Sequence, residues 1–308
     1  MMKKTLFGSR AGEPQLRLEE YRLLRDLVSE RLGVWFGPES RSSLERRLRE
    51  RLNVRGLTSF ADYYQLLKYS PLATEEWDEA ADILTTHETY FFREDYQLRA
   101  FQHELLPMLA ARPRRRIQVW SAGCSTGEEA YTIAMLMLES GLFDPARGWE
   151  VRVYGSDLSK KCIASARRGV YGPASFRVTS ADARAKWFVR QPSEPREFPS
   201  TSVPTGPYYG VSPEVRTLCH FTQMNLLDEE RTPLVGRCDV IFCRNVVIYF
   251  DAAARRRVID MFYERLVPGG VLLLGHSESL LNVTTAFELL HLKEDLVYRK
   301  PLLASSVK

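Results

Sequence analysis

The residues with the clearest chemical meaning lie in the run WSAGCSTGEEAYTIA, residues 120–134. A small-residue turn with Gly123 and Gly127 precedes two adjacent carboxylates, Glu128 and Glu129. The turn lacks the third glycine of a dinucleotide fingerprint and the Gly-Lys-Ser/Thr of a phosphate-binding loop. The carboxylates would repel a phosphate and attract a cation. We therefore expect a ligand with an amino or sulfonium group, such as S-adenosylmethionine, unless both acids only stabilise the first helical turn.

A further acid, Asp157, lies where an open α/β fold could bind a nucleoside. Residues 151–157, VRVYGSD, read as a strand that ends in Asp157. In open α/β folds an acid at the end of the second strand receives ribose hydroxyls. Here it follows the turn by about 30 residues, against the ~20 of the dinucleotide fingerprint. The alternative is that Asp157 or Ser159 caps the next helix.

Other chemistry-bearing groups give weaker or negative signals. The connector TTHETYFFRE, residues 85–94, is too aromatic for a plain linker and is expected to pack, with a ligand as one candidate for its contact. His87 and Glu88 are adjacent, which is not metal-ligand spacing, and the five cysteines form no C-x-x-C pair. We expect no metal and no disulfide framework. GHSES, residues 275–279, lacks the final glycine of a nucleophile elbow, which argues against a hydrolase.

The elements that must position these groups follow an α/β pattern. Strands are predicted from Ile117 to Trp120 and over residues 151–157, 217–224, 238–243 and 271–274, with helices from Glu128 and over 252–266. Residues 287–292 and 296–299 are expected to close the sheet as an antiparallel pair. The proline-rich stretch 171–213 interrupts this pattern and predicts a small β subdomain or flap, with residues 186–190 and 197–203 as candidate strands.

The first ninety residues predict a separate all-helical domain, with helices beginning near Leu16, Arg41, Phe60 and Trp77. The second helix, expected over 41–52, is dense in arginine; the residues that could dock a partner are Arg41, Arg46, Arg47, Arg49 and Arg51. One interpretation is a solvated face that pairs locally with Glu45 and Glu50. The other is a docking surface for an acidic protein.

Composition limits the function classes. The chain has 308 residues, 44% of them hydrophobic, and a net charge of +4. This supports a globular core, and the charge is too small to indicate nucleic-acid binding by itself. No apolar run is long enough to span a bilayer, and Met1-Met2-Lys3-Lys4 is not followed by a secretory apolar core. We expect a cytoplasmic protein without membrane insertion.

Six segments together resemble the CheR family, the chemotaxis receptor glutamate O-methyltransferases. They are TTHETYFFRE (85–94), WSAGCSTGEEAYTIA (120–134), YGSDLS (154–159), NLLD (225–228), FCRNVVIYF (242–250) and GHSESL (275–280). They occur in the family's order and spacing and cover nearly the whole chain. The first and fifth are highly specific.

The resemblance implies a helical domain over residues 1–90 and a methyltransferase domain over 91–308. The latter is a Rossmann-like, seven-stranded S-adenosylmethionine domain with an antiparallel β subdomain inserted at about 171–214. The implied reaction is methyl transfer from S-adenosylmethionine to receptor glutamate γ-carboxylates, which leaves S-adenosylhomocysteine.

The resemblance also implies site residues. Cofactor binding is expected of His87, Thr89, Arg93, Glu129, Asp157, Asn225, Leu226, Cys243, Arg244 and Asn245. Arg93 and Tyr249 are expected to orient the reacting groups rather than to shuttle a proton. His87 departs from the family, which usually has Asn there.

The implied partners are the cytoplasmic methylation helices of chemotaxis receptors, with a receptor C-terminal tail as a further candidate at the β subdomain. Two alternatives remain open. The acceptor could be a carboxylate of another cytoplasmic protein, or the chain could be a non-catalytic adaptor that binds S-adenosylmethionine or S-adenosylhomocysteine.

Overall fold

The computed structural model describes residues 14–192 and 206–302. It divides the chain into two compact units, Met1–Thr86 and His87–Lys308, which we call the helical unit and the sheet unit. The sequence placed this boundary at residue 90, within the connector; in the structure the division falls after Thr86.

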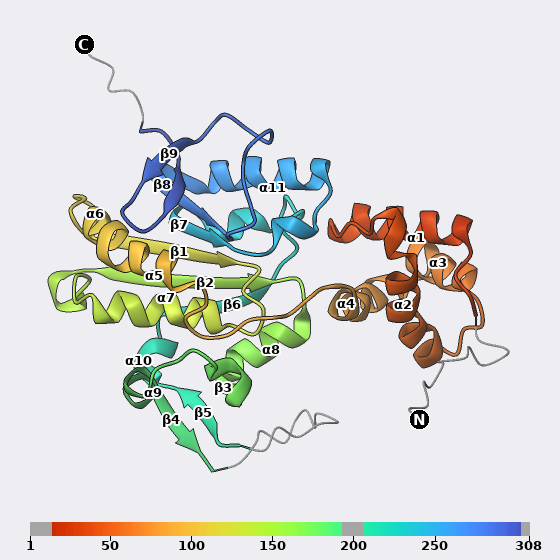
Figure 1. Ribbon diagram of the computed structural model, residues 1–308, viewed down its shortest axis with the longest axis horizontal. Helices are drawn as coiled ribbons and strands as arrows, with labels where there is room; N and C mark the ends of the chain where they lie inside the picture. The colour runs from red at the N-terminus through yellow and green to blue at the C-terminus, as the bar shows by residue number, and fades with distance from the viewer. Residues whose placement is uncertain (1–13, 193–205, 303–308) are drawn as a thin grey trace, which may run out of the picture. The chain divides into compact units, whose positions relative to one another are not determined.

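The helical unit consists of amphipathic helices joined by short loops (Figure 1). Its helices are α1 (Leu18–Leu32), α2 (Arg41–Arg55), α3 (Phe60–Tyr69) and α4 (Ala73–Leu84), with a 3-10 turn at Pro38–Ser40. Gly33 and Gly56 end α1 and α2 in the left-handed conformation. Leu44, Leu48 and Leu52 of α2 are fully buried, as the helical spacing of leucines predicted.

Arg51 corrects the sequence interpretation of the arginine-rich helix. It lies on the buried side of α2, and its Nε and Nη2 donate to Glu76 Oε1 and Oε2 at 2.8 and 2.9 Å. Tyr63 Oη donates to the same carboxylate at 2.8 Å, and Arg55 pairs with it as well. Arg51 is therefore a structural residue and not part of a docking surface. Arginine density alone could not reveal this, because the partner acid lies on another helix.

The buried carboxylate of Glu76 generates a stability prediction. Burial alone would raise its pKa, but hydrogen bonds from Arg51, Arg55 and Tyr63 outweigh burial and lower the pKa. Its stabilising contribution is therefore present above the unfolded pKa and is lost as the pH falls through the folded pKa. Glu76→Ala should destabilise the helical unit by about 3–5 kcal/mol, because it leaves Arg51 buried without its anion.

The measurement is amide hydrogen exchange of α2 to α4 in the full chain, from pH 7 down to pH 4. The matched control is Glu75→Ala, since the Glu75 side chain is 66% exposed and pairs with Arg55 at 3.1 Å. It should cost only about 0–1 kcal/mol. Equal losses in the two variants would contradict the structural role of Glu76.

The sheet unit is built on a seven-stranded sheet in the order β6-β2-β1-β7-β8-β10-β9 (Figure 1). The strands are β1 (Arg116–Ala122), β2 (Glu150–Asp157), β6 (Cys219–Gln223), β7 (Cys238–Cys243), β8 (Leu266–Leu274), β9 (Glu288–His291) and β10 (Leu296–Arg299). The first five pair in parallel, and β10 pairs antiparallel with β8 and β9. The predicted α/β fold with a closing antiparallel pair is confirmed.

Both faces of the sheet are covered, which explains why its central strands are continuously apolar. Val240 and Phe242 of β7 lie in the cluster that includes α7 (Glu128–Glu139) and the stretch α5–α6 (Asp95–Ala110, with a π-helical turn at Phe101–Leu105). The alternate residues Ile241 and Cys243 pack with α11 (Ala252–Arg265) on the other face. Helix α8 (Lys160–Arg168) packs against β2 and β6.

Strand β8 is longer than its apolar run predicted. Pro268, Gly269 and Gly270 were expected to stop the preceding helix, yet they lie within the strand. Helix α11 ends at Arg265, and Gly269 takes a positive φ of 73° where its N–H reaches Lys300 O at 2.9 Å. The Pro-Gly-Gly residues therefore form a bulge-like shift in the pairing of β8 with β7, and not a loop between α11 and β8.

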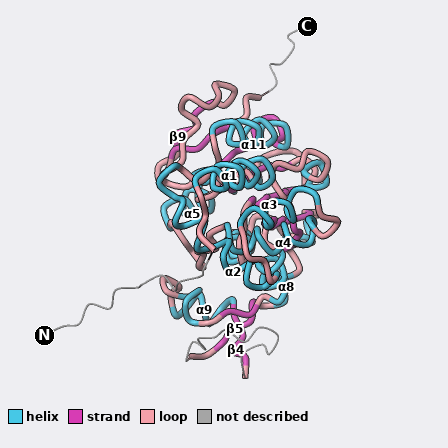
Figure 2. Tube along the Cα trace, turned by 90° about the vertical axis from the view of Figure 1, so that its right-hand side faces the viewer, coloured by secondary structure: helices cyan, strands magenta, loops and turns pink. Residues whose placement is uncertain are grey.

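A second, three-stranded antiparallel sheet has the order β3-β5-β4. Its strands are β3 (Val170–Tyr171), β4 (Phe188–Gln191) and β5 (Tyr208–Val211), and the preceding α9 (Ala181–Trp187) lies beside β4 and β5 (Figure 2). The strand predicted at 186–190 is confirmed only from Phe188, since Lys186 and Trp187 end α9, and its partner is β5. The other candidate, 197–203, lies outside the described residues.

The remaining short helices are η3 (Pro145–Arg147), η4 (Pro173–Phe176), α10 (Pro213–Arg216), η5 (Thr232–Val235) and η6 (Val247–Tyr249). Among the described residues, none of the helices is both long enough and apolar enough to cross a bilayer.

Candidate functional site

The five parallel strands end at one edge of the sheet, and the candidate site residues gather there. After β1 the chain forms β2 and β6 on one side, then returns to form β7 and β8 on the other. The direction of strand order thus reverses between β1 and β7. Ligands of open α/β sheets bind beyond the carboxyl ends of the strands at such a switch point.

Backbone amides of the glycine-rich turn fix the end of β2. Gly123 and Cys124 donate their N–H groups to Ser156 O at 2.8 and 2.9 Å. The Ser125 N–H reaches Asp157 Oδ2 at 2.8 Å, and the Ser159 N–H reaches Asp157 Oδ1 at 2.9 Å. The N-cap of α8 is Ser159, whose hydroxyl accepts from Cys162 N. Asp157 is therefore an oriented, half-buried carboxylate at the strand end and not the cap.

The two acids that open α7 have different surroundings. Glu128 is buried, and its carboxylate accepts from Thr126 Oγ1 at 2.7 Å and from Ser175 Oγ at 2.8 Å. Burial raises the pKa of Glu128. Glu129 retains 17% side-chain exposure and accepts from Ser121 Oγ at 2.6 Å. Burial also raises its pKa, opposed by Arg244. Glu129 is thus the acid that can still face a ligand cation.

Arg244 has a role that the sequence did not predict. Its side chain is only 2% exposed; Nη2 donates to Arg93 O at 2.6 Å and to Glu94 Oε2 at 3.0 Å, while Nη1 lies 3.4 Å from Glu129 Oε2. The guanidinium is used within the protein, so we assign Arg244 to holding the connector and Glu129 rather than to ligand contact. The sequence did not predict Glu94 as the partner of Arg244, because no local pattern links residues that are 150 positions apart.

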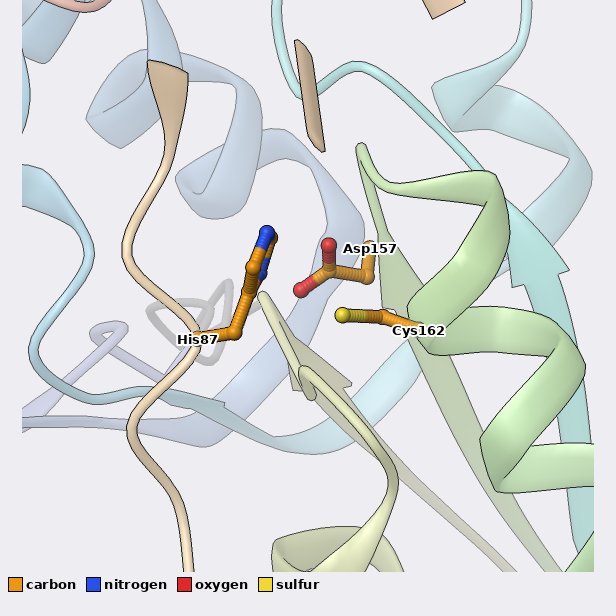
Figure 3. A group of neighbouring side chains, drawn as sticks. All are labelled: His87, Asp157 and Cys162. Carbon is orange, nitrogen blue, oxygen red and sulfur yellow. The ribbon is translucent and has the colours of Figure 1, made fainter. Parts of the chain in front are cut away.

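Three side chains converge beside the glycine-rich turn (Figure 3). A ring nitrogen of His87, a carboxylate oxygen of Asp157 and Sγ of Cys162 all lie within 4.8 Å of one another. Sequence reasoning singled out the first two separately and missed Cys162, because its position on α8 carries no motif. This grouping places the connector at the carboxylate of Asp157. Ser125 Oγ adds a hydrogen bond to His87 O at 3.1 Å.

Two other connector residues expected in the site, Thr89 and Arg93, lie close to this group in sequence. Thr89 and Arg93 both retain partial exposure. Arg93 Nη1 donates to Glu88 O at 2.8 Å, and the guanidinium lies 5.7 Å from the ring centre of Tyr90. Phe91 is fully buried against Tyr171, Phe176 and Phe188. The aromatic residues therefore anchor the connector, as the sequence predicted for a packed segment.

On the far side of β2, Asn225 follows β6. The Met224 N–H donates to Asp157 O at 2.9 Å, so Asn225 and Asp157 end neighbouring strands. Asn225 Oδ1 accepts from Leu227 N at 3.0 Å. Leu226 is buried in the cluster that contains Trp120. The Asn225 side-chain amide thus lies at the strand end next to that of Asp157, whereas Leu226 belongs to the core.

Residues after β7 complete the edge. Cys243 is fully buried, and burial raises the pKa of its thiol, which is therefore protonated at neutral pH and unsuited to act as a nucleophile. Asn245 has a positive φ of 59°, and Tyr249 in η6 is 37% exposed. Of the site residues expected in this segment, Asn245 and Tyr249 are the ones that retain exposure.

This donor set fits S-adenosylmethionine better than a phosphate-bearing cofactor. Asp157 can accept from two ribose hydroxyls, and Glu129 suits an ammonium or sulfonium group. The conformation and packing of the turn require its two glycines, since Gly123 and Gly127 have φ of 82° and 99° and a Cβ on either would collide with Val246 or Ala166.

Gly123 generates a prediction with a matched control. A Cβ on Gly123 would lie 2.4 Å from Val246 Cγ2, whereas Gly148, with nearly the same φ of 81°, has open space around it. Gly148→Ala should cost only the conformational strain of about 1 kcal/mol. Gly123→Ala should cost a further 1–3 kcal/mol or so from overpacking, and it should loosen residues 245–248. Thermal unfolding and amide hydrogen exchange measure both effects; equal behaviour of the two variants would contradict the packing of Val246 on the turn.

Comparison with known proteins agrees with this geometry. Residues 87–296 match the family model described as the CheR methyltransferase SAM-binding domain, and residues 19–85 match the CheR methyltransferase all-alpha domain. Chemotaxis protein methyltransferase 2 of Vibrio cholerae is 32% identical over 278 residues, covering 90% of this chain and 91% of that protein. The chemotaxis protein methyltransferase of Escherichia coli is 34% identical over 275 residues, covering 87% of each. The chain therefore belongs to the CheR methyltransferase family.

Proposed function

We propose that this protein transfers the methyl group of S-adenosylmethionine to the γ-carboxylate of glutamates in chemotaxis receptors. The observation that carries the proposal is the oriented carboxylate of Asp157 beside the glycine-rich turn, in a chain that belongs to this family along both units.

The chemistry requires alignment more than acid–base catalysis. A glutamate carboxylate is already ionised at neutral pH, so no general base has to activate it. S-adenosylmethionine supplies an electrophilic methyl group on a sulfonium. One S–C bond breaks and one O–C bond forms, which gives a methyl ester and S-adenosylhomocysteine without net proton transfer. The protein's task is to hold the reacting atoms in line at near-attack distance.

Residues of this chain divide that task. Asp157 and Asn225 hold the nucleoside end, and Glu129 holds the cationic end. Arg93 and Tyr249 orient the acceptor; Tyr249 is exposed, and a cation at position 93 suits an incoming carboxylate. Arg244 keeps Glu129 and the connector in place. His87, which stands where the family usually has Asn, adds an imidazole beside Asp157.

The first test is Asp157→Ala, titrated calorimetrically with S-adenosylhomocysteine. Loss of hydrogen bonds to a charged acceptor should weaken binding at least about 100-fold. The control is Asp260→Ala, because Asp260 pairs with Arg256 on the exposed side of α11. Unchanged affinity in Asp157→Ala, or no binding by the wild type, would refute the proposed site.

The same titration separates binding from orientation. Tyr249→Phe and Arg93→Ala should lower receptor methylation without adding an ionisation to the pH–rate profile. Tyr249→Phe should also leave S-adenosylhomocysteine affinity unchanged. A new ionisation in either profile would indicate proton transfer and would remove the orienting role.

The docking surface is smaller than the sequence suggested. Arg41 and Arg46 are exposed. Arg47 is half-buried and donates to Ile83 O at 2.9 Å and Thr85 O at 3.3 Å, and Arg49 pairs with Glu45 and also contacts Pro14 O. With Arg51 buried, Arg41 and Arg46 are the best candidates to meet the acidic methylation helices of a receptor.

We expect Arg46→Glu to lower kcat/KM for a receptor by about ten-fold at low salt, with less effect at high salt, because steering charges are screened. Binding of S-adenosylhomocysteine should not change. The control is Arg147→Glu, whose side chain is 78% exposed on the sheet unit. Equal rates across ionic strength would contradict the docking role.

A receptor without its C-terminal tail supplies a further comparison in that assay. Strand β4 is an edge of the small sheet, and an extended tail could add to it. If the tail docks there, its removal should lower the rate of wild type and Arg46→Glu by the same factor. No effect of removal would dismiss tail binding.

A further inference from the structure

Glu278 makes an unusual set of contacts. It lies in the segment after β8, in the GHSES run, and its carboxylate accepts four backbone N–H groups. Oε2 accepts from Gly275 N at 2.7 Å and Asn245 N at 2.8 Å. Oε1 accepts from Val246 N at 2.9 Å and Ile248 N at 3.2 Å. Three of the four donors belong to the segment after β7.

The four N–H donors match the number of acceptor sites on an ionised carboxylate. Such a group has about four lone-pair sites and no donor. A glutamine in its place would present one oxygen and an NH₂ group that cannot accept. The N–H groups that faced its NH₂ would then be unsatisfied, and each would carry a desolvation penalty.

The segment held in this way has an unusual backbone conformation and carries expected site residues. Asn245 has a positive φ of 59°, which asparagine adopts more readily than most non-glycine residues. The same segment leads into η6, which carries Tyr249. Val246 also packs against the backbone of Gly123, so the segment touches the glycine-rich turn after β1.

Gly275 permits this arrangement. A Cβ at residue 275 would lie 2.8 Å from Asn245 N and 2.9 Å from Glu278 Oε2. The ends of β7 and β8 therefore approach closely because one of them carries no side chain at this point. Glu278 joins these two strand ends through their amides. Val246 packs against Gly123 and so connects them to the turn after β1.

We propose that Glu278 is a positioning residue for methyl transfer: its carboxylate fixes the backbone of residues 245–248 so that Asn245 and Tyr249 stay aligned with the turn after β1. It does not touch the reacting atoms. This inference rests on the proposed function and extends it to a residue outside the expected site.

The test compares Glu278→Gln with Glu278→Asp and with the control Glu264→Gln. The Glu264 side chain is 72% exposed, and its carboxylate lies 4.0 Å from Arg265. Initial rates with varied S-adenosylmethionine and receptor give kcat and both KM values. Titration with S-adenosylhomocysteine counts the competent sites. Amide hydrogen exchange reports on residues 245–248 directly.

Glu278→Gln should lower kcat by about 100-fold per competent site, since misplacement of about 1 Å costs this much, and should change KM for S-adenosylmethionine far less. Exchange at residues 245–248 should become faster. Glu278→Asp, which keeps the charge, should recover part of kcat, and Glu264→Gln should match the wild type.

Three outcomes would overturn the proposal. One is wild-type kcat per competent site in Glu278→Gln, even with a lower melting temperature, because the residue would then be merely structural. Another is unchanged exchange at residues 245–248. The third is no recovery in a folded Glu278→Asp. In contrast, a wild type that binds no S-adenosylhomocysteine and methylates no receptor would refute the proposed function itself.

Discussion

The arrangement of the site depends on one buried charge, the guanidinium of Arg244. A charge inside a protein has to be paired, and Arg244 is paired with carboxylates from two different elements, Glu94 of the connector and Glu129 of α7. It also donates to the carbonyl of Arg93. These contacts join the strand end of β7, the first turn of α7 and the connector, so the proposed cofactor residues keep a common frame.

Much of this could be predicted from the sequence, for reasons that are physical. The turn at Gly123–Gly127 is recognisable because a run of small residues separates a strand pattern from a helix pattern. The strand ending at Asp157 is recognisable because an apolar alternation ends there in an acid. Parallel strands bring their carboxyl ends to one edge, so those two motifs had to meet. The fold class, the closing antiparallel pair and the helical unit follow from the same patterns.

What the sequence could not reveal depends on contacts between distant residues. Helical spacing puts Arg51 on the same face as Leu44 and Leu48, but the spacing does not name its buried partner, Glu76, which lies on another helix. Likewise, the grouping of Cys162 with His87 and Asp157 depends on how α8 follows β2. Strand β8 ran through a Pro-Gly-Gly sequence that normally marks a break. In each case the outcome depends on a tertiary partner that the local pattern does not identify.

The position of Glu278 along the chain has a consequence for synthesis. The helical unit ends at Thr86, so all of its residues are synthesised before the sheet unit. The backbone amides of Asn245, Val246 and Ile248, by contrast, lack their acceptor until Glu278 has emerged from the ribosome. A nascent or truncated chain that ends before Glu278 can contain the glycine-rich turn, Asp157, Asn245 and Tyr249 and still have no finished site. The segment with Glu278 thereby completes the site only after all the proposed cofactor residues have been synthesised.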